Sequence, residues 1–300
     1  MGDIISLNSI SEAHKLMGIS KPSHPLISVF HHTPEMHMSF GDFRFTGNLY
    51  LISMKEGTGS LGYGRHHYDF EEGTMTFVAP GQVLSAAEGV PVNEDKGWSV
   101  LFHPDLIRKT ALGRHIDSYS FFNYEVNEAL HLSDREKNSL AELVQKIEEE
   151  INLNTDMHTQ ALIVSNLELI LNYCTRYYDR QFYTRSDQNK DLVSRFESFL
   201  KEYFNTARQL DLGIPSVSYC SEQLNMSPSY LSDLLKKETG RNAQDHIHSF
   251  IVERAKTILL NSNESISEVA FGLGFDYSQH FSTLFKAKTG LTPKEYRSLN

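Results

Sequence analysis

The chain has 300 residues, enough for about two ordinary domains, and 40% of them are hydrophobic, so each domain can bury a core. The net charge is −10 at pH 7, no apolar run approaches the roughly 18–20 residues of a membrane span, and the N-terminus lacks a secretion-signal pattern. These features exclude low-complexity and membrane-spanning chains, and the two unpaired cysteines, Cys174 and Cys220, predict a reducing, cytoplasmic setting.

Residues 26–105 have the composition of a β-rich region. Short runs of β-branched and aromatic residues are separated by Gly, Pro and Asp, which favour turns. Many short strands with frequent turns predict a small barrel or sandwich. The expected strands include residues 26–30, 43–45, 48–52 and 75–78.

Helical patterns follow, at about residues 133–183. Ser133 and Glu136 form a capping-box pattern that predicts a helix start, and a second helix is expected over 157–183. We predict a homodimer through helix 157–183; packing of its apolar stripe on its own domain is the alternative. The positions in this stripe step by three or four and are Ala161, Val164, Leu167, Leu171, Cys174 and Tyr178.

The acidity of the chain belongs to its N-terminal part. Residues 191–300 hold 12 Lys and Arg against 13 Asp and Glu, a net charge of −1, which leaves −9 for the remainder. A nearly neutral domain can still bind DNA if its basic side chains share one face. We expect domains at 1–185 and 191–300, with the polar segment 184–189 as the linker.

The C-terminal part contains an internal repeat. Residues 231–240 match residues 281–290 at an offset of 50, with five of ten positions identical, and 216–226 match 265–275 at an offset of 49. Each copy fits a helix, a tight turn and a second helix that ends at a glycine. A connecting helix is expected over 243–260.

The second helix of each copy combines an apolar face with a short polar face. These polar side chains can form hydrogen bonds with base edges, and a lysine one turn on can contact phosphate. An ordinary solvated face is the alternative, but two matched faces favour double-stranded DNA. A connecting helix about 27 Å long can place both second helices in successive major grooves, about 34 Å apart. The DNA-binding candidates are Ser229, Ser232, Asp233, Lys236 and Lys237 in the first copy and Gln279, His280, Ser282, Thr283 and Lys286 in the second.

A long, ordered pattern covers about the last third of the chain. Its residues are Ile266-Ser267-Glu268-Val269-Ala270, Gly274-Phe275, Phe281, Phe285-Lys286, Thr289-Gly290-Leu291-Thr292-Pro293 and Tyr296-Arg297. The pattern closely resembles the AraC/XylS family of bacterial transcription regulators. The resemblance implies two helix-turn-helix units joined by a long helix. It also implies a sequence-specific DNA-binding regulator rather than an enzyme, with RNA polymerase as a further candidate partner.

Two positions depart from the family pattern. His280 stands where the family usually has Tyr, and Thr283 where it often has Arg or Lys. Asp233 is also acidic at a position expected to face DNA. The operator sequence therefore does not transfer from the family, and His280 is either a contact or a packing residue.

Many such regulators resemble one another in having a cupin-like barrel before dimerising helices, and residues 73–81 are similar to the cupin strand-turn-strand segment. The fold class expected is α+β, with a cupin-like barrel, a helical dimerisation segment and an all-α C-terminal domain. We expect the N-terminal domain to sense a small-molecule effector; an oligomerisation module without a ligand is the alternative. Aromatic pocket candidates, each of which also fits a plain core, are Phe43, Phe45, Tyr50, Phe77 and Trp98.

A metal-dependent cupin enzyme with an appended helical domain is the competing function. Cupin enzymes hold a metal with an H-x-H pair, a Glu and a later His. Here His66 and His67 are adjacent, so in a strand they point to opposite faces, and Gln82 follows Pro80 and Gly81 where a His is needed. The set is incomplete, and we predict no metal and no other cofactor. Further residues that could supplement it are Glu71, Glu72, His31, His32, His37 and His103.

Overall fold

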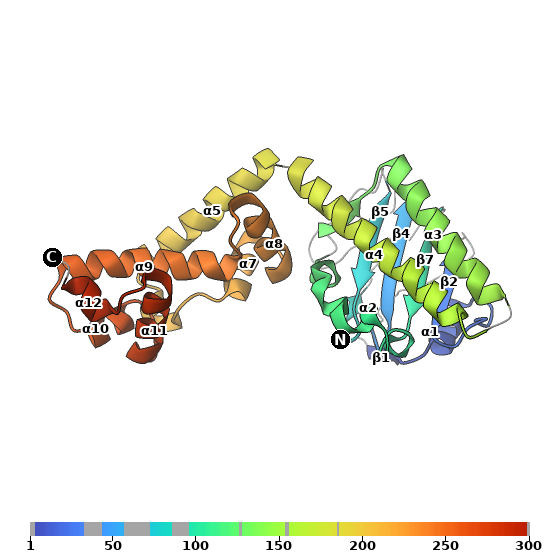
Figure 1. Ribbon diagram of the computed structural model, residues 1–300, viewed down its shortest axis with the longest axis horizontal. Helices are drawn as coiled ribbons and strands as arrows, with labels where there is room; N and C mark the ends of the chain where they lie inside the picture. Colours follow the sequence, from blue (N-terminus) through green and yellow to red (C-terminus); the bar gives the residue numbers. More distant parts are fainter. Residues whose placement is uncertain are drawn as a thin grey trace. The chain divides into compact units, whose positions relative to one another are not determined.

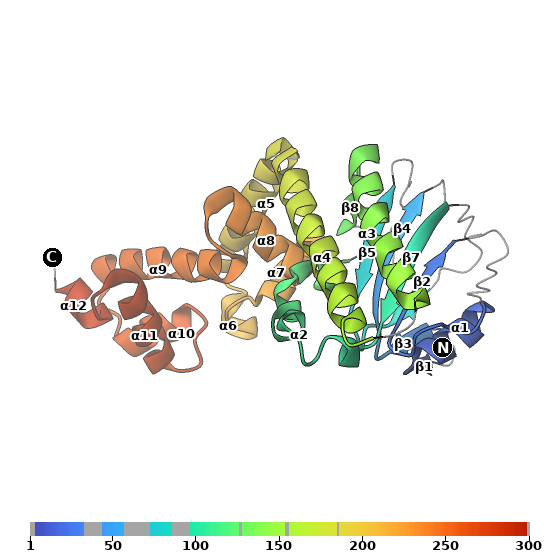
Figure 2. The same cartoon turned by 45° about the vertical axis from the view of Figure 1, so that its right-hand side comes forward.

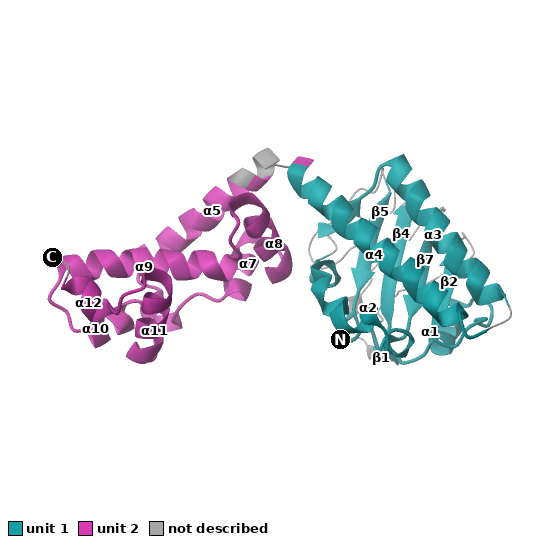
Figure 3. Ribbon diagram, viewed as in Figure 1, with its two compact units in different colours: residues 1–183 teal, residues 184–300 magenta. Residues whose placement is uncertain are grey.

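A computed structural model describes residues 4–32, 44–56, 73–85, 96–125, 128–153, 156–184 and 186–298. The chain forms two compact units, residues 1–183 (unit 1) and 184–300 (unit 2), which Figure 3 shows in separate colours. None of the helices in the described ranges is both long enough and apolar enough to cross a membrane. Cys174 and Cys220 are buried free thiols.

Unit 1 is built on a five-stranded antiparallel sheet with the strand order β2-β7-β4-β5-β8 (Figure 1). Its strands are β2 (Ile27–His31), β4 (Tyr50–Glu56), β5 (Thr74–Val78), β7 (Lys96–Phe102) and β8 (Leu130–His131). A smaller sheet has the order β1-β3-β6 and consists of β1 (Ile4–Leu7), β3 (Arg44–Gly47) and β6 (Leu84–Ser85). The expected strands overlap β2, β3, β4 and β5, but the described strands form two open sheets and not the expected closed barrel.

Helices in unit 1 cover one face of the large sheet and flank the small one. Figure 2 shows α3 (Asp134–Asn152) and α4 (Thr159–Thr184) lying together along one face of the large sheet. Alternation along β7 directs Trp98, Val100 and Phe102 to this face, and all three are buried. The remaining helices are α1 (Ile10–Met17), α2 (Ala111–His115) and short 3-10 turns at Pro104–Leu106, Ile116–Ser118 and Ser120–Asn123.

The apolar stripe of α4 packs against its own sheet, which makes the predicted dimer seam wrong. Leu171 is fully buried, and Cys174 Sγ lies 3.8 Å from Met75 Sδ in β5. The other stripe residues are buried too, except Ala161, which is exposed. On the opposite side of α4, Leu162 and Leu169 are 47% and 43% exposed. Any partner of this helix must therefore contact that outer side.

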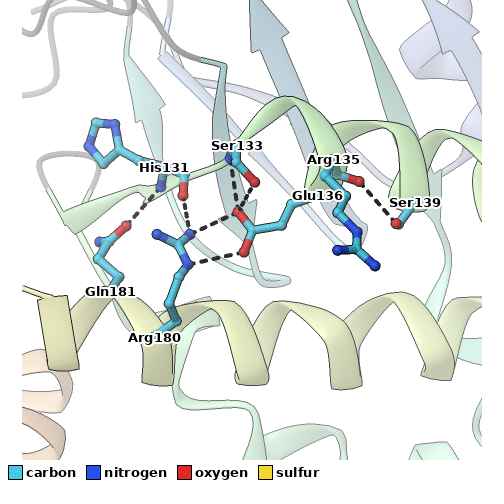
Figure 4. A network of polar contacts seen from close by, with 7 residues as sticks. All are labelled: His131, Ser133, Arg135, Glu136, Ser139, Arg180 and Gln181. Carbon is cyan, nitrogen blue, oxygen red and sulfur yellow. Dashed lines mark hydrogen bonds and ion pairs between the residues drawn. The ribbon is translucent and has the colours of Figure 1, made fainter.

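A polar network ties the start of α3 to α4 (Figure 4). The capping box predicted at Ser133 is present, because the Glu136 carboxylate accepts from the Ser133 amide at 2.8 Å. Arg180 of α4 donates to the same carboxylate at 3.0 Å and to the His131 carbonyl at 2.7 Å. The Gln181 side-chain oxygen accepts from the His131 amide at 2.9 Å. These bonds fix strand β8, the cap and the last turns of α4 to one another.

All the regular secondary structure in the described part of unit 2 is helical. Its helices are α5 (Ser186–Asn205), α6 (Gln209–Leu212), α7 (Val217–Leu224), α8 (Pro228–Thr239), α9 (Ala243–Asn261), α10 (Ile266–Gly272), α11 (Ser278–Thr289) and α12 (Pro293–Arg297). Helix α9 runs through the middle, and its buried Ile251 and Ala255 belong to one core with residues of both flanking helix pairs. The connecting helix expected over 243–260 is α9. Because α5 begins at Ser186, most of the expected linker 184–189 is helical instead.

Candidate nucleic-acid interface

The sequence repeat corresponds to a structural repeat in unit 2. Helices α8 and α11 each span 12 residues and end at a glycine with a left-handed backbone, Gly240 at φ 77° and Gly290 at φ 80°. In the last turn, Thr239 and Thr289 each donate their hydroxyl to the carbonyl four residues earlier, at 2.7 and 2.8 Å. Both helices therefore end in the same way, as the matched sequences predict.

The tight turns of the two helix pairs, α7–α8 and α10–α11, differ in the residue that has the left-handed backbone and in the contacts around it. The α7–α8 turn has Asn225 at φ 57° and ψ 50°, and the α10–α11 turn has Gly274 at φ 89°. A Cβ at Gly274 would lie 3.0 Å from the Gln209 carbonyl oxygen and 3.0 Å from the Gly213 carbonyl carbon. The Gln209 side chain also donates to the Gly272 carbonyl at 3.0 Å. Helix α6, which the sequence did not predict, thus packs directly on the second turn.

We expect Gly274→Asn to destabilise unit 2 by about 2–3 kcal/mol, because the added side chain meets backbone atoms that cannot move easily. Asn225→Gly is the matched control and should change stability by less than about 1 kcal/mol, since glycine adopts the same backbone angles. Urea unfolding of the full chain followed by circular dichroism at 222 nm measures both. Equal effects of the two substitutions would contradict the packing of α6 on the second turn.

The structure places the predicted DNA-binding residues on the outer faces of α8 and α11. The inner faces are core, with Leu231 and Leu235 in α8 and Phe281 and Phe285 in α11 fully buried. Exposed on the outer faces are Lys236, Lys237, Gln279, His280, Thr283 and Lys286, and half-buried are Ser229, Ser232, Asp233 and Ser282. Each helix therefore presents a short polar strip to solvent.

Local bonds determine what two of these side chains can offer. The Ser282 hydroxyl donates to the Ser278 carbonyl at 3.0 Å, which leaves its oxygen lone pairs to accept from a base amino group. Lys288 lies outside the strip and forms an ion pair with Asp245 of α9 at 2.9 Å. The hydrogen bond from Lys288 lowers the pKa of the Asp245 carboxyl. Lys286, one turn after Ser282, is the exposed lysine of the α11 strip.

Tyr277 is an exposed aromatic residue beside the α11 strip that the sequence analysis did not name. The residue is 65% exposed, and the centroid of its ring lies 5.4 Å from that of the His280 ring. His280 occupies the position equivalent to Tyr230, which is buried, whereas His280 is exposed. His280 is therefore a surface residue and not a core residue. The sequence does contain a feature that could have pointed to Tyr277, because this aromatic residue comes directly before Ser278, where α11 begins.

The pocket candidates of the N-terminal domain fall mostly in the core. Phe77 and Trp98 are buried on the sheet face that α3 and α4 cover, and the Tyr50 ring stacks on Phe102 at 4.9 Å. Phe43 and the side chain of Phe45 lie outside the described residues. The described aromatic candidates therefore contribute packing.

The three described metal-ligand candidates, His31, His32 and His103, each lie beside a polar group of the protein. His31 pairs with Glu148 at 3.2 Å, His32 bonds the Ser99 hydroxyl at 2.8 Å, and His103 lies 3.5 Å from the Asp105 carboxylate. In the described ranges no three His, Cys, Asp or Glu side chains are grouped to hold a metal ion. The remaining predicted ligands lie outside those ranges and are His37, His66, His67, Glu71 and Glu72.

Comparison with known proteins agrees with the repeat in unit 2. Residues 220–298 match the family model described as a helix-turn-helix domain. The chain is 24% identical over 255 residues to the HTH-type transcriptional activator RhaS of Escherichia fergusonii, which covers 78% of this chain and 87% of RhaS. It is 22% identical over 301 residues to the HTH-type transcriptional activator RhaR of Mannheimia succiniciproducens, which covers 99% and 98% of the two chains.

Among solved structures, the C-terminal domain of the two-component response regulator yesN from Fusobacterium nucleatum is 30% identical, with a TM-score of 0.32. The match covers 36% of this chain and 98% of that domain. The matched helix-turn-helix domain, together with relatives that are named transcriptional activators, supports an AraC/XylS-type DNA-binding transcription regulator.

Proposed function

We propose that unit 2 contains two helix-turn-helix units, α7–α8 and α10–α11, which insert α8 and α11 into successive major grooves of double-stranded DNA. The observation that carries this proposal is the pair of equivalent helices with outward polar strips on either side of α9. Helix α9 has 19 residues and is therefore about 28 Å long. With the adjoining turns, this length suits the roughly 34 Å repeat of the duplex.

Specificity in this proposal comes from a few directed contacts. The net charge of −1 over residues 191–300 provides little general attraction to phosphate. Hydroxyl and amide side chains of the strips contact base edges, and Lys236, Lys237 and Lys286 contact the backbone. Binding should therefore discriminate strongly between sequences and depend moderately on salt.

Selection of bound duplexes from a random DNA pool by the full chain tests the proposal. We expect an enriched site with two conserved segments whose centres lie about one helical turn apart. Enrichment of a single short segment would show that only one helix pair reads DNA. Recovery of an unenriched pool at low salt would overturn the proposal.

We expect Gln279→Ala to relax the preference at one base pair by about 1–3 kcal/mol, whereas Lys286→Ala should weaken binding evenly across sequences. Lys286→Ala should also make the slope of log affinity against log salt smaller by about 1. Fluorescence anisotropy on the selected site and on single-base variants measures both effects. Lys201→Ala, at an exposed position in α5, is the control and should change neither. If Gln279→Ala lowered the affinity equally for all DNA sequences, Gln279 would contact the DNA backbone and not a base.

We further propose that unit 1 senses a small molecule and joins two copies of the chain, as a cupin-like domain of this family would. Strand β5 followed by the left-handed turn at Gly81 supports the cupin-like relation. Exposed Leu162 and Leu169 lie seven residues apart on the outer side of α4 and support a helix–helix contact with a second copy. RhaS and RhaR are named as activators, so we extend the proposal to activation by contact with RNA polymerase.

A further inference from the structure

The two helix pairs differ at the residue directly before each second helix. Ser227 precedes α8 and Tyr277 precedes α11, at equivalent positions of the repeat, which are 50 residues apart. Ser227 is 2% exposed, and its hydroxyl oxygen accepts from the Tyr230 amide at 3.2 Å, so it caps its helix. Tyr277 is 65% exposed, and its side chain makes no cap bond in the structure as described. The same position therefore supports the helix in one copy and not in the other.

Tyrosine is a poor choice for the stability of α11. Helices start preferentially at Ser, Thr, Asp or Asn, whose short side chains accept a hydrogen bond from the first turn. An exposed ring also gains little from the hydrophobic effect. A residue that departs from the local rule in this way is typical of a functional position. The side chain of Tyr277 therefore serves binding better than folding.

The ring of Tyr277 extends the polar strip of α11 at the N-terminal end of the helix. Its centroid lies 5.4 Å from that of His280, with the two ring planes at 67°, an edge-to-face arrangement. Such aromatic pairs are attractive, so the exposed ring has a preferred position beside the strip. In helix-turn-helix proteins the N-terminal residues of the second helix contact base edges. In the proposed complex, Tyr277 therefore lies next to the bases.

Charge favours a base over the DNA backbone as the partner of Tyr277. Asp276, directly before Tyr277, is exposed and acidic, so a phosphate at this end of α11 would meet a like charge. The ring offers mainly apolar surface, and the apolar group that bases expose in the major groove is the 5-methyl group of thymine. Gln279, two residues on, has an amide that matches adenine. Both side chains thus fit A·T pairs.

We propose that Tyr277 is a specificity-determining residue that recognises a thymine through contact between its ring and the 5-methyl group. This inference rests on the proposed function of unit 2 and names a base that α11 reads. One methyl group transferred from water into an apolar contact strengthens binding by about fourfold. The DNA segment that α11 reads should therefore contain a thymine at a fixed position.

Deoxyuridine substitution tests the contact directly. Each thymine of the site selected from the random pool is replaced singly by deoxyuridine, which removes the methyl group and keeps the base pair. Fluorescence anisotropy should show one thymine whose replacement weakens wild-type binding by about fourfold. With Tyr277→Ser, the thymine and deoxyuridine duplexes should bind equally well at this position. The proposal would be overturned if no thymine lost its methyl effect in Tyr277→Ser.

Tyr277→Phe separates the ring from the hydroxyl. We expect the methyl effect to persist in this variant because the ring remains. If Tyr277→Phe lost the methyl effect as fully as Tyr277→Ser, the contact would depend on the hydroxyl, and recognition of thymine by the ring would be rejected. Lys201→Ala, the exposed control in α5, should retain the effect.

Thermal unfolding of the same variants distinguishes recognition from a structural role. Tyr277→Ser introduces the cap that Ser227 provides to α8, so unit 2, followed by circular dichroism at 222 nm, should unfold at the wild-type temperature or up to about 5 °C higher. The fluorescence of Trp98, the only tryptophan of the chain, reports on unit 1 and should not change. A lower unfolding temperature of unit 2 together with loss of the methyl effect would assign Tyr277 to the fold and overturn the proposal.

Failure of this inference is separable from failure of the proposed function. If the full chain selects a site with two segments but no methyl effect depends on Tyr277, unit 2 still reads DNA and only the role of Tyr277 is lost. If the pool stays unenriched, both the proposed function and the thymine contact are lost.

Discussion

Leu171→Asp is expected to unfold unit 1, with a loss of more than about 4 kcal/mol, rather than to yield a folded monomer. Leu171 is fully buried between α4 and the sheet. The substitution removes a large apolar side chain and places a carboxylate in the apolar core, where the loss of hydration disfavours its charge. Since whole domains are stable by only about 5–15 kcal/mol, most of the population should lose its tertiary structure. A red shift of the emission from buried Trp98 measures this loss directly.

Leu169→Asp is the matched control, two residues away on the same helix but 43% exposed. We expect it to leave the Trp98 emission and the stability of unit 1 within about 0.5 kcal/mol of wild type. If the outer side of α4 joins two copies, sedimentation velocity should show that this variant is a monomer. A folded monomer with Leu171→Asp, together with a dimer for Leu169→Asp, would restore the original seam.

The helices of unit 2 were predictable because their boundaries are encoded locally. Ser265 with Glu268 forms the expected capping box, and α8 and α11 end at Gly240 and Gly290 as expected. The spacing of the apolar residues then determines which face of each helix is buried, so the exposed polar strips of α8 and α11 could be predicted too. Helix α6 was missed because it has only four residues and no period, and its contact with Gly274 joins segments far apart in sequence.

Unit 1 was less predictable because its organisation depends on long-range pairing. The apolar period of α4 predicted a buried stripe correctly but could not identify its partner, which is the sheet and not a second helix. The central strand β7 was not specified because Lys96–Phe102 mixes serine and glycine with apolar residues. Its register with β4 is what gathers Ser53 and Ser99, and register between distant strands cannot be read from either segment alone.

Phe281→Ala is expected to destabilise unit 2 by about 3–5 kcal/mol and to weaken DNA binding through folding instead of contact. Phe281 is fully buried, and its ring centroid lies 5.5 Å from that of Phe275 and 5.7 Å from that of Phe285. Truncation leaves a cavity where α11 meets the α10–α11 turn. The unfolding temperature of unit 2, followed by circular dichroism, should fall by more than about 10 °C.

Two comparisons separate this folding effect from direct recognition. The Trp98 transition of unit 1 should not move, because the cavity lies in the other unit. Phe281→Leu refills most of the cavity, so its free energy of unfolding should be within about 1–1.5 kcal/mol of wild type. Its DNA affinity at low temperature should be restored as well. Gln279→Ala, on the opposite face of α11, should show the reverse pattern, with altered base preference and unchanged stability. If Phe281→Ala lowered DNA affinity without lowering the unfolding temperature, the assignment of inner and outer faces in α11 would be wrong.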